Sequence, residues 1–144
     1  MTTVLVCDDA PLAREAVRRA VASVPGVERV SAAGSGEEVL ARYPMERPNV
    51  VLMDVRMPGM GGVEATRRLV AEHPGAIVVM LTMGEDIEGV AAAISVGARG
   101  YMQVMPFWAR ALGDGDAAVL FQLQTNLRFG CVILRHYLAI EDGN

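Results

Sequence analysis

The sequence predicts an α/β fold in which helices cover both faces of a parallel β-sheet. Short apolar runs alternate with segments of helical periodicity over residues 3–103. The run Val-Val-Leu-Met at residues 50–53 is apolar at every position, which is typical of a strand buried on both faces of a parallel sheet. Alternation of this kind implies right-handed crossovers between parallel strands.

The first three expected elements are a strand, a helix and a second strand. Residues 4–7 form an apolar run that stops at two aspartates. Residues 11–22 carry apolar side chains at helical spacing, which predicts a helix. Residues 27–32 show a more alternating pattern, so we expect this strand at an edge of the sheet.

A second helix and a buried strand follow. Ser35 and Glu38 have the spacing of a capping box, which predicts a helix that continues through Tyr43. The apolar strand then runs over residues 50–54 and ends at Asp54, just before a segment rich in glycine and proline.

The remaining elements complete a five-stranded sheet. We expect a helix near residues 61–73, a strand at 76–81 that ends at Thr82, an alanine- and valine-rich helix at 86–96, and a short strand at 99–103. Five strands favour the flavodoxin-like, doubly wound order 2-1-3-4-5, in which strands 1 and 3 are neighbours.

Length and composition limit the class of protein. A chain of 144 residues with 52% hydrophobic and 21% charged residues fits one folded domain and excludes a disordered chain. The net charge of −4 offers no basic footprint for nucleic acid, so we expect no direct DNA binding by this chain. No apolar stretch reaches the ~18 residues of a membrane-spanning helix. The first strand begins almost at the first residue, so no signal peptide is expected.

Two residue types add to this picture. Cys7 and Cys131 lack the spacing of metal ligands, and we expect both to be free thiols of a cytoplasmic protein. The 13 basic residues are all arginines, so the chain contains no lysine. Any mechanism that needs a lysine is therefore excluded.

Acidic residues end two of the expected strands. Asp8 and Asp9 follow the first strand and Asp54 ends the third, so the predicted strand order brings them together at the carboxyl edge, where open α/β sheets bind ligands. A carboxylate can accept a phosphoryl group, and Mg²⁺ prefers oxygen ligands. We expect Asp54 to be a nucleophile beside a Mg²⁺ site formed by the three aspartates and the backbone carbonyl of Arg56. Alternatively, Asp8 caps the next helix and Asp54 only begins a turn.

Thr82 lies on the same edge of the predicted sheet. Its hydroxyl can hydrogen-bond a phosphoryl oxygen on Asp54. It can also cap the helix that follows, which Glu85 three residues later would suit, and the two roles are compatible. Tyr101, taken alone, is an ordinary edge-strand aromatic residue.

The chain changes character at about residue 104. All three phenylalanines and the only tryptophan lie in residues 104–144, where Gly113 and Gly115 interrupt the expected last helix. We interpret residues 1–103 as the core domain and 104–144 as an atypical helix and extension packed on it. The alternatives are an aromatic partner or dimer surface and a tail of foreign or frameshifted origin.

One ordered set of motifs resembles the receiver domain of bacterial two-component response regulators (CheY-like). The set consists of Asp8-Asp9, Asp54 with Met57-Pro58-Gly59, Thr82, and Gly97-Ala98-Arg99-Gly100-Tyr101. The stretches around the aspartates look closest to actinobacterial regulators of the LuxR/FixJ type, including developmental ones.

The resemblance implies a function for each motif. Asp54 would be the phosphoacceptor, Asp8 and Asp9 would bind Mg²⁺, and Thr82 and Tyr101 would form a coupled switch pair. A histidine kinase or a small acyl phosphate would donate the phosphoryl group. Phosphorylation would then shift a surface between two conformations that a partner or a dimer mate reads, as expected for part of a transcriptional regulator.

The sequence departs from this family at one position. The family places a lysine shortly after the fifth strand, and here Val104 occupies that position. Valine cannot supply the missing charge, and Arg99 and Arg110 are the candidates to reach inward and supply it. The DNA-binding domain that usually follows in such regulators is also not expected within residues 104–144.

Three functions compete. The first is a receiver that signals through phosphorylation of Asp54. The second is a receiver-like interaction or dimerisation module that works without phosphate, which the valine at position 104 motivates. The third is an aspartyl-phosphate hydrolase, which is disfavoured because Arg56 stands where such enzymes typically need an acid-base carboxylate. We therefore expect a switch protein and not an enzyme.

Overall fold

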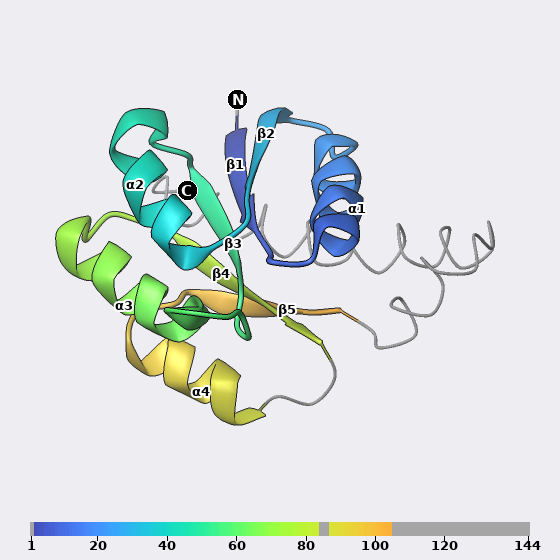
Figure 1. The fold of residues 1–144 in the computed structure, drawn as a ribbon. Helices are drawn as coiled ribbons and strands as arrows, with labels where there is room; N and C mark the ends of the chain where they lie inside the picture. The colour runs from blue at the N-terminus through green and yellow to red at the C-terminus, as the bar shows by residue number, and fades with distance from the viewer. Residues whose placement is uncertain (1, 84–86, 105–144) are drawn as a thin grey trace.

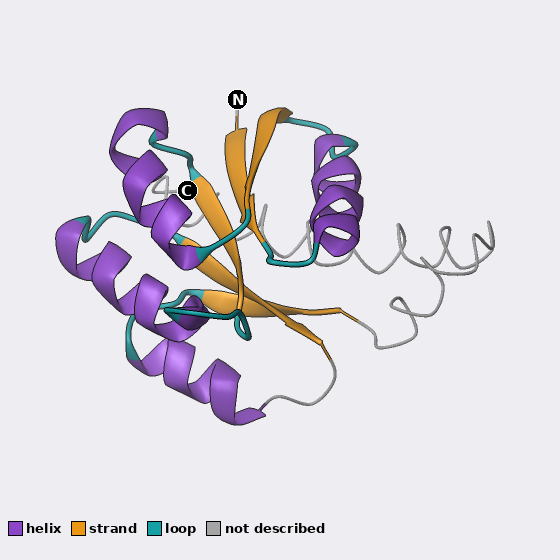
Figure 2. Ribbon diagram, viewed as in Figure 1, coloured by secondary structure: helices purple, strands orange, loops and turns teal. Residues whose placement is uncertain are grey.

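The structure is a computed structural model that describes residues 2–83 and 87–104. Strands and helices alternate along this part of the chain (Figures 1 and 2). The strands are β1 (Thr2–Cys7), β2 (Val27–Ala33), β3 (Val50–Asp54), β4 (Val78–Met83) and β5 (Gly100–Val104). The helices are α1 (Pro11–Ala22), α2 (Gly36–Glu46), α3 (Gly61–Glu72) and α4 (Ile87–Ser95). None of these helices is long and apolar enough to cross a membrane.

The five strands form one parallel sheet in the order β2-β1-β3-β4-β5. The predicted fold class and strand order are therefore confirmed, and β2 lies at an edge as expected. In the register, Cys7 of β1 lies opposite Met53 of β3, and Asp54 lies opposite Leu81 of β4. The carboxyl ends of β1 and β3 consequently lie side by side, which places their acidic residues at one edge of the sheet.

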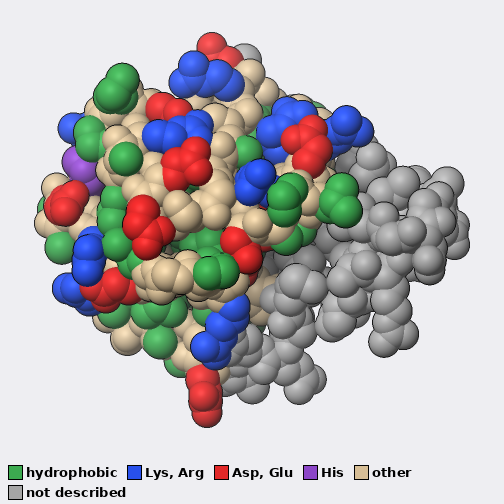
Figure 3. Space-filling view, in the orientation of Figure 1, with side chains coloured by type: hydrophobic (Ala, Val, Ile, Leu, Met, Phe, Trp, Pro, Cys, Tyr) green, Lys and Arg blue, Asp and Glu red, His purple; other side chains and the backbone are tan. Residues whose placement is uncertain are grey.

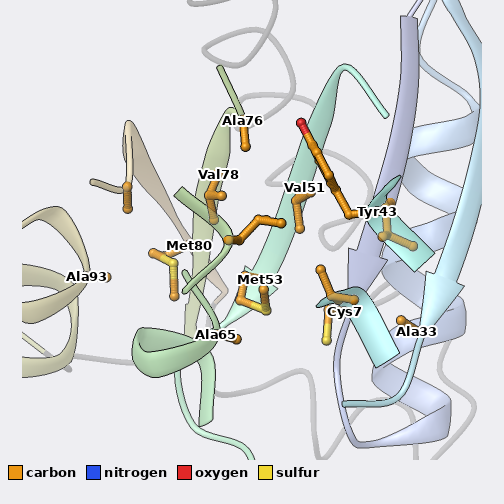
Figure 4. Close-up of a cluster of buried hydrophobic side chains, with 14 of the residues drawn as sticks. Cys7, Ala33, Tyr43, Val51, Met53, Ala65, Ala76, Val78, Met80 and Ala93 are labelled. Atoms are coloured by element: carbon orange, nitrogen blue, oxygen red, sulfur yellow. The ribbon is translucent and has the colours of Figure 1, made fainter. Parts of the chain in front are cut away.

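Each face of the sheet has its own apolar layer. Val17 and Val21 of α1 pack with Val6 and Leu52 on one face, whereas α2, α3 and α4 cover the other face (Figure 1). The second layer includes Val51 and residues of all three of these helices. Figure 4 shows part of that layer, with Cys7, Val51, Met53, Val78 and Met80 on the strands and Tyr43, Ala65 and Ala93 on the helices.

Helix α2 begins at the predicted cap Ser35, although its Glu38 accepts from the Gly34 N–H in place of the Ser35 N–H of a capping box, and the helix is longer than expected. Ser35 Oγ accepts a hydrogen bond from the Glu38 N–H at 3.1 Å, and the Glu38 carboxylate accepts from the Gly34 N–H at 2.8 Å. The helix continues past Tyr43 to Glu46, and it ends where Arg47 adopts a left-handed conformation with φ 45°. The Arg47 N–H donates to the Tyr43 carbonyl at 2.9 Å, which closes the additional turn.

Strand β4 begins at Val78, two residues later than the pattern predicted. The Ala76 N–H donates to the His73 carbonyl at 2.9 Å, so Ala76 closes the turn after α3 and does not join the sheet. Its side chain is nevertheless buried. The apolar pattern at this position therefore reports burial correctly and the secondary structure incorrectly.

Arginines on three helices form ion pairs with glutamates one turn away. Arg18 lies 2.6 Å from Glu15 on α1, and Arg42 lies 2.9 Å from Glu38 on α2. On the face drawn in Figure 3, arginine and acidic side chains are accordingly interspersed. Pairing within helices leaves these arginines less available for a partner such as a nucleic acid.

The first turn of α3 lies directly against the end of β3. A methyl group at Gly62 would overlap the carbonyl oxygen of Asp54, and the Gly62 N–H donates to the Val55 carbonyl at 3.1 Å. Only glycine permits this approach. The position of the Asp54 backbone therefore depends on the contact with α3.

We expect Gly62→Ala to lower the free energy of unfolding by about 3 kcal/mol, because either α3 or the end of β3 must move to make room for the methyl group. Urea unfolding followed by circular dichroism measures the change. Gly75→Ala is the matched control, since no atom lies within 4 Å of a methyl group there. A loss at Gly62 no larger than the loss at Gly75 would contradict the described contact.

Candidate functional site

Three carboxylates meet at the carboxyl edge of the sheet. Asp8 and Asp9 follow β1, Asp54 ends β3, and one oxygen of each lies within 4.8 Å of the others. Asp8 is 8% exposed, Asp54 is half-buried and Asp9 is exposed. The structure thus brings together the three residues that the strand order was expected to bring together.

Nearby donors hold two of these aspartates. Asp8 Oδ1 accepts from the Ala10 N–H at 2.9 Å, and Asp54 Oδ1 accepts from the Arg56 N–H at 3.2 Å. The second contact matches the alternative interpretation, in which Asp54 begins a turn. The first is a local turn and not a helix cap, because Ala10 itself is the N-cap residue of α1 and has no side-chain cap. These local bonds leave other carboxylate oxygens available to a ligand.

Burial and mutual repulsion raise the pKa values in this cluster. The pKa of Asp54 rises from 3.8 to about 7, first because the carboxyl is buried and then because Asp8 and Asp9 are close. Burial also raises the pKa of Asp8. Burial, and then the charges of Asp8 and Asp54, raise the pKa of the Cys7 thiol to about 12, so Cys7 remains an uncharged, buried thiol.

The donor set fits a hard divalent cation. All three side chains offer carboxylate oxygens, the ligand type that Mg²⁺ prefers, and Mg²⁺ needs few protein ligands because it keeps several waters. A dication would also offset the repulsion that raises the pKa of Asp54. The residues present at this edge of the sheet are therefore suited to Mg²⁺.

The two expected switch residues lie on neighbouring strands. Thr82 of β4 is 3% exposed and follows Leu81, the residue opposite Asp54. Tyr101 of β5 is opposite Met80 and is 52% exposed. Because strand side chains alternate between faces, Thr82 and Tyr101 project toward the same face, on which α4 packs. The proposed capping partner Glu85 lies outside the described residues.

Of the two arginines that were expected to replace the charge of the missing lysine, Arg99 and Arg110, the structure describes only Arg99. β5 ends at Val104, opposite Met83, at the same edge of the sheet as the carboxylates. Arg99 precedes β5, and its N–H donates to the carbonyl of Val78 at 2.8 Å, at the opposite end of the strands. A five-residue strand spans roughly 16 Å, so the idea that Arg99 reaches the acidic site is wrong. Arg110 lies outside the described residues, as does all of the segment 105–144.

Two residues that the sequence motifs do not single out contact the backbone at this site or in the loop that follows it. Arg14 Nη1 of α1 donates to the carbonyl oxygen of Asp8 at 3.0 Å, and its charge opposes the rise in the pKa of Asp8. Glu37 of α2 accepts a hydrogen bond from the Met60 N–H at 3.0 Å, in the loop that follows Asp54. Arg14 lies one turn into the helix after Asp9, a spacing that gives a weak sequence signal. The Glu37 contact spans 23 residues and has no such signal.

This chain belongs to the response regulator receiver domain family, whose model matches residues 4–103. The match covers the sheet, its helices and the acidic site. The resemblance stated from the sequence motifs is confirmed at the level of this family.

Individual relatives agree with this assignment. Response regulator GacA of Pseudomonas viridiflava is 45% identical over 102 residues, which make up 71% of this chain and 48% of GacA, so the chain spans about half the length of this curated relative. The signal receiver domain of NarL from Mycobacterium tuberculosis has a TM-score of 0.65 at 31% identity, covering 71% of this chain and 82% of that one. A LuxR-family response regulator from Aurantimonas has a TM-score of 0.68 at 27% identity, covering 90% and 99%.

We expect Asp54→Asn to raise the free energy of unfolding of the metal-free protein at pH 8. The folded-state pKa of about 7 exceeds the ordinary value of 3.8, so ionisation of Asp54 destabilises the folded state once the pH passes that lower value. The advantage of asparagine should be full above about pH 7 and shrink as the pH falls toward 4, where Asp54 is protonated in both states.

Urea unfolding in EDTA, repeated between pH 4 and pH 8, measures this difference. Glu72→Gln is the matched control, because this carboxylate is exposed at the end of α3. Equal stability of Asp54→Asn and the wild-type protein at pH 8 would contradict the raised pKa of Asp54 in the folded protein.

Proposed function

We propose that this chain is a phosphorylation switch, in which Asp54 accepts a phosphoryl group in the presence of Mg²⁺. The observation that carries the proposal is the cluster of three carboxylates within 4.8 Å at the carboxyl ends of β1 and β3. In this role the chain is a switch and not an enzyme that turns over a substrate.

Asp54 acts as the nucleophile. One carboxylate oxygen forms the new bond to phosphorus, and the bond between phosphorus and the donor breaks, so that the donor leaves with the electron pair. The attacking carboxylate must be ionised, whereas its pKa of about 7 leaves a substantial protonated fraction at neutral pH. Its activity therefore depends on a nearby positive charge.

Asp8 and Asp9, together with Asp54 and the backbone carbonyl of Arg56, would hold Mg²⁺. When bound, Mg²⁺ supplies positive charge that favours the ionised nucleophile and neutralises the phosphoryl oxygens. The Arg14 guanidinium supports this arrangement by holding the Asp8 backbone. Each of these residues thus acts by positioning or by charge.

Thr82 and Tyr101 would convert phosphorylation into a change of surface. The hydroxyl of Thr82 lies one residue beyond the strand partner of Asp54, which suits a contact with a phosphoryl oxygen. Tyr101 is half-exposed on the same face of the sheet, where a partner can read its position. Phosphorylation would shift the population between two arrangements of this face.

The wider setting is part of the same proposal. A histidine kinase or a small acyl phosphate would be the donor, and a partner protein or a second copy of the chain would read the switch in the cytoplasm. The similarity to GacA and to a LuxR-family regulator supports a role in transcription regulation. The resemblance to actinobacterial developmental regulators remains a prediction.

Incubation with acetyl phosphate and Mg²⁺ should label the wild-type protein with one phosphate, detected by intact mass spectrometry. We expect Asp54→Asn and EDTA to abolish labelling, because they remove the nucleophile and the cation, while Glu72→Gln labels normally. Labelling of Asp54→Asn would overturn the proposal. A folded wild-type protein that is not labelled would also overturn it.

A second candidate is a receiver-like module for protein interaction or dimerisation that needs no phosphate. The observation that favours it is Val104, which stands where the family has lysine, in a chain without lysine. Under this candidate, Asp54→Ala leaves partner binding or dimerisation unchanged. Under the first candidate, Asp54→Ala removes the phosphate-dependent part of either interaction.

We expect Val104→Lys to raise the rate of labelling by acetyl phosphate roughly tenfold or more, because an ammonium group at the end of β5 can stabilise the charge on the phosphoryl oxygens. Val104→Met is the matched control, since it adds length without charge. A rate for Val104→Lys equal to that of Val104→Met would show that position 104 does not limit the reaction.

A further inference from the structure

Two adjacent glutamates in the first turn of α2 point to different segments. The Glu38 carboxylate accepts a hydrogen bond from the Gly34 N–H, in the short connection between β2 and α2. The Glu37 carboxylate instead accepts from the Met60 N–H at 3.0 Å, in the loop between β3 and α3. The first contact closes the start of α2, whereas the second joins α2 to the segment that follows Asp54.

Met60 lies at the end of that loop, where α3 begins. It is the N-cap residue of α3 and has no side-chain cap of its own, so the Glu37 carboxylate supplies negative charge close to the start of the helix. The backbone N–H of Glu37 itself and then the hydrogen bond from Met60 lower the pKa of Glu37, and the charge of Arg68 adds a smaller effect. Glu37 is therefore ionised while it holds the loop.

Glycines allow the loop to approach this carboxylate. Gly59 adopts φ +76°, and a methyl group there would lie 3.1 Å from Glu37 Oε1. Just after the loop, Gly62 in the first turn of α3 lies directly against the Asp54 carbonyl. The end of the loop where α3 begins is thus held against the Asp54 backbone by the Gly62 contact and against α2 by Glu37.

We propose that Glu37 is a positioning residue for the acidic site. By holding Met60, it keeps the Asp54–Met60 loop in the arrangement that presents the Asp54 carboxylate and the Arg56 carbonyl to Mg²⁺. This inference rests on the proposed function of the site. It adds a residue from α2, a helix that contributes none of the expected ligands.

The test compares Glu37→Ala, Glu37→Gln and Glu38→Ala in the full chain. The two alanine variants each remove one negative charge from the same helical turn, but only Glu37 contacts Met60. Mg²⁺ titrations by NMR measure the half-saturating Mg²⁺ concentration. Hydrogen exchange of the Met60 amide in EDTA measures how firmly Glu37 holds the loop in the absence of metal.

We expect Glu37→Ala to raise the half-saturating Mg²⁺ concentration on the order of tenfold, as for the loss of other groups that orient metal ligands. The Met60 amide should also exchange faster. Glu37→Gln retains an oxygen acceptor and should restore most of both properties, whereas Glu38→Ala should lower the melting temperature with little change in Mg²⁺ binding.

Two outcomes would overturn the proposal while leaving the function of the site intact. One is wild-type Mg²⁺ binding by Glu37→Ala, and the other is an equal loss in Glu38→Ala. A wild-type protein that takes up neither Mg²⁺ nor phosphate would instead overturn the proposed function, and this inference with it.

Discussion

Repulsion among three carboxylates is the constraint on which the site depends. Parallel pairing of β1 with β3 forces Asp8, Asp9 and Asp54 together, and burial of the first and third makes the repulsion costly. Burial of the carboxyl and then repulsion from Asp8 and Asp9 raise the pKa of Asp54 to about 7. The apolar layers on both faces of the sheet maintain this arrangement. A cation that binds in the cluster reduces the repulsion among the carboxylates.

The parts of the molecule around the site have separate tasks. Helices α2 and α3 pack against each other closely enough that a methyl group at Gly36 would collide with Ala65, and together they hold the loop after Asp54. The opposite side of the site, formed by β4 and β5, carries Thr82 and the exposed Tyr101. A firmly packed side that positions the nucleophile and a more exposed side that can report its state suit a switch.

Most of the fold was predictable because it follows from local patterns. Apolar runs located the five strands, and the predicted cap Ser35 located the start of α2. The predicted bounds of β4 and α2 were wrong because the local sequence pattern at these positions is compatible with more than one structure. The buried Ala76 closes a turn and does not extend β4, and α2 continues past Tyr43 to Glu46, where a left-handed Arg47 ends it.

By itself, the sequence determined the order of the elements, the aspartates at two strand ends and the valine where the family has lysine. Only the tertiary structure decided the pKa of Asp54, the position of Arg99 at the end of the strands opposite the site and the contact between Glu37 and the loop. The physical reason is that strand patterns are local. Electrostatic coupling and contacts between helices depend instead on distances between residues far apart in the chain.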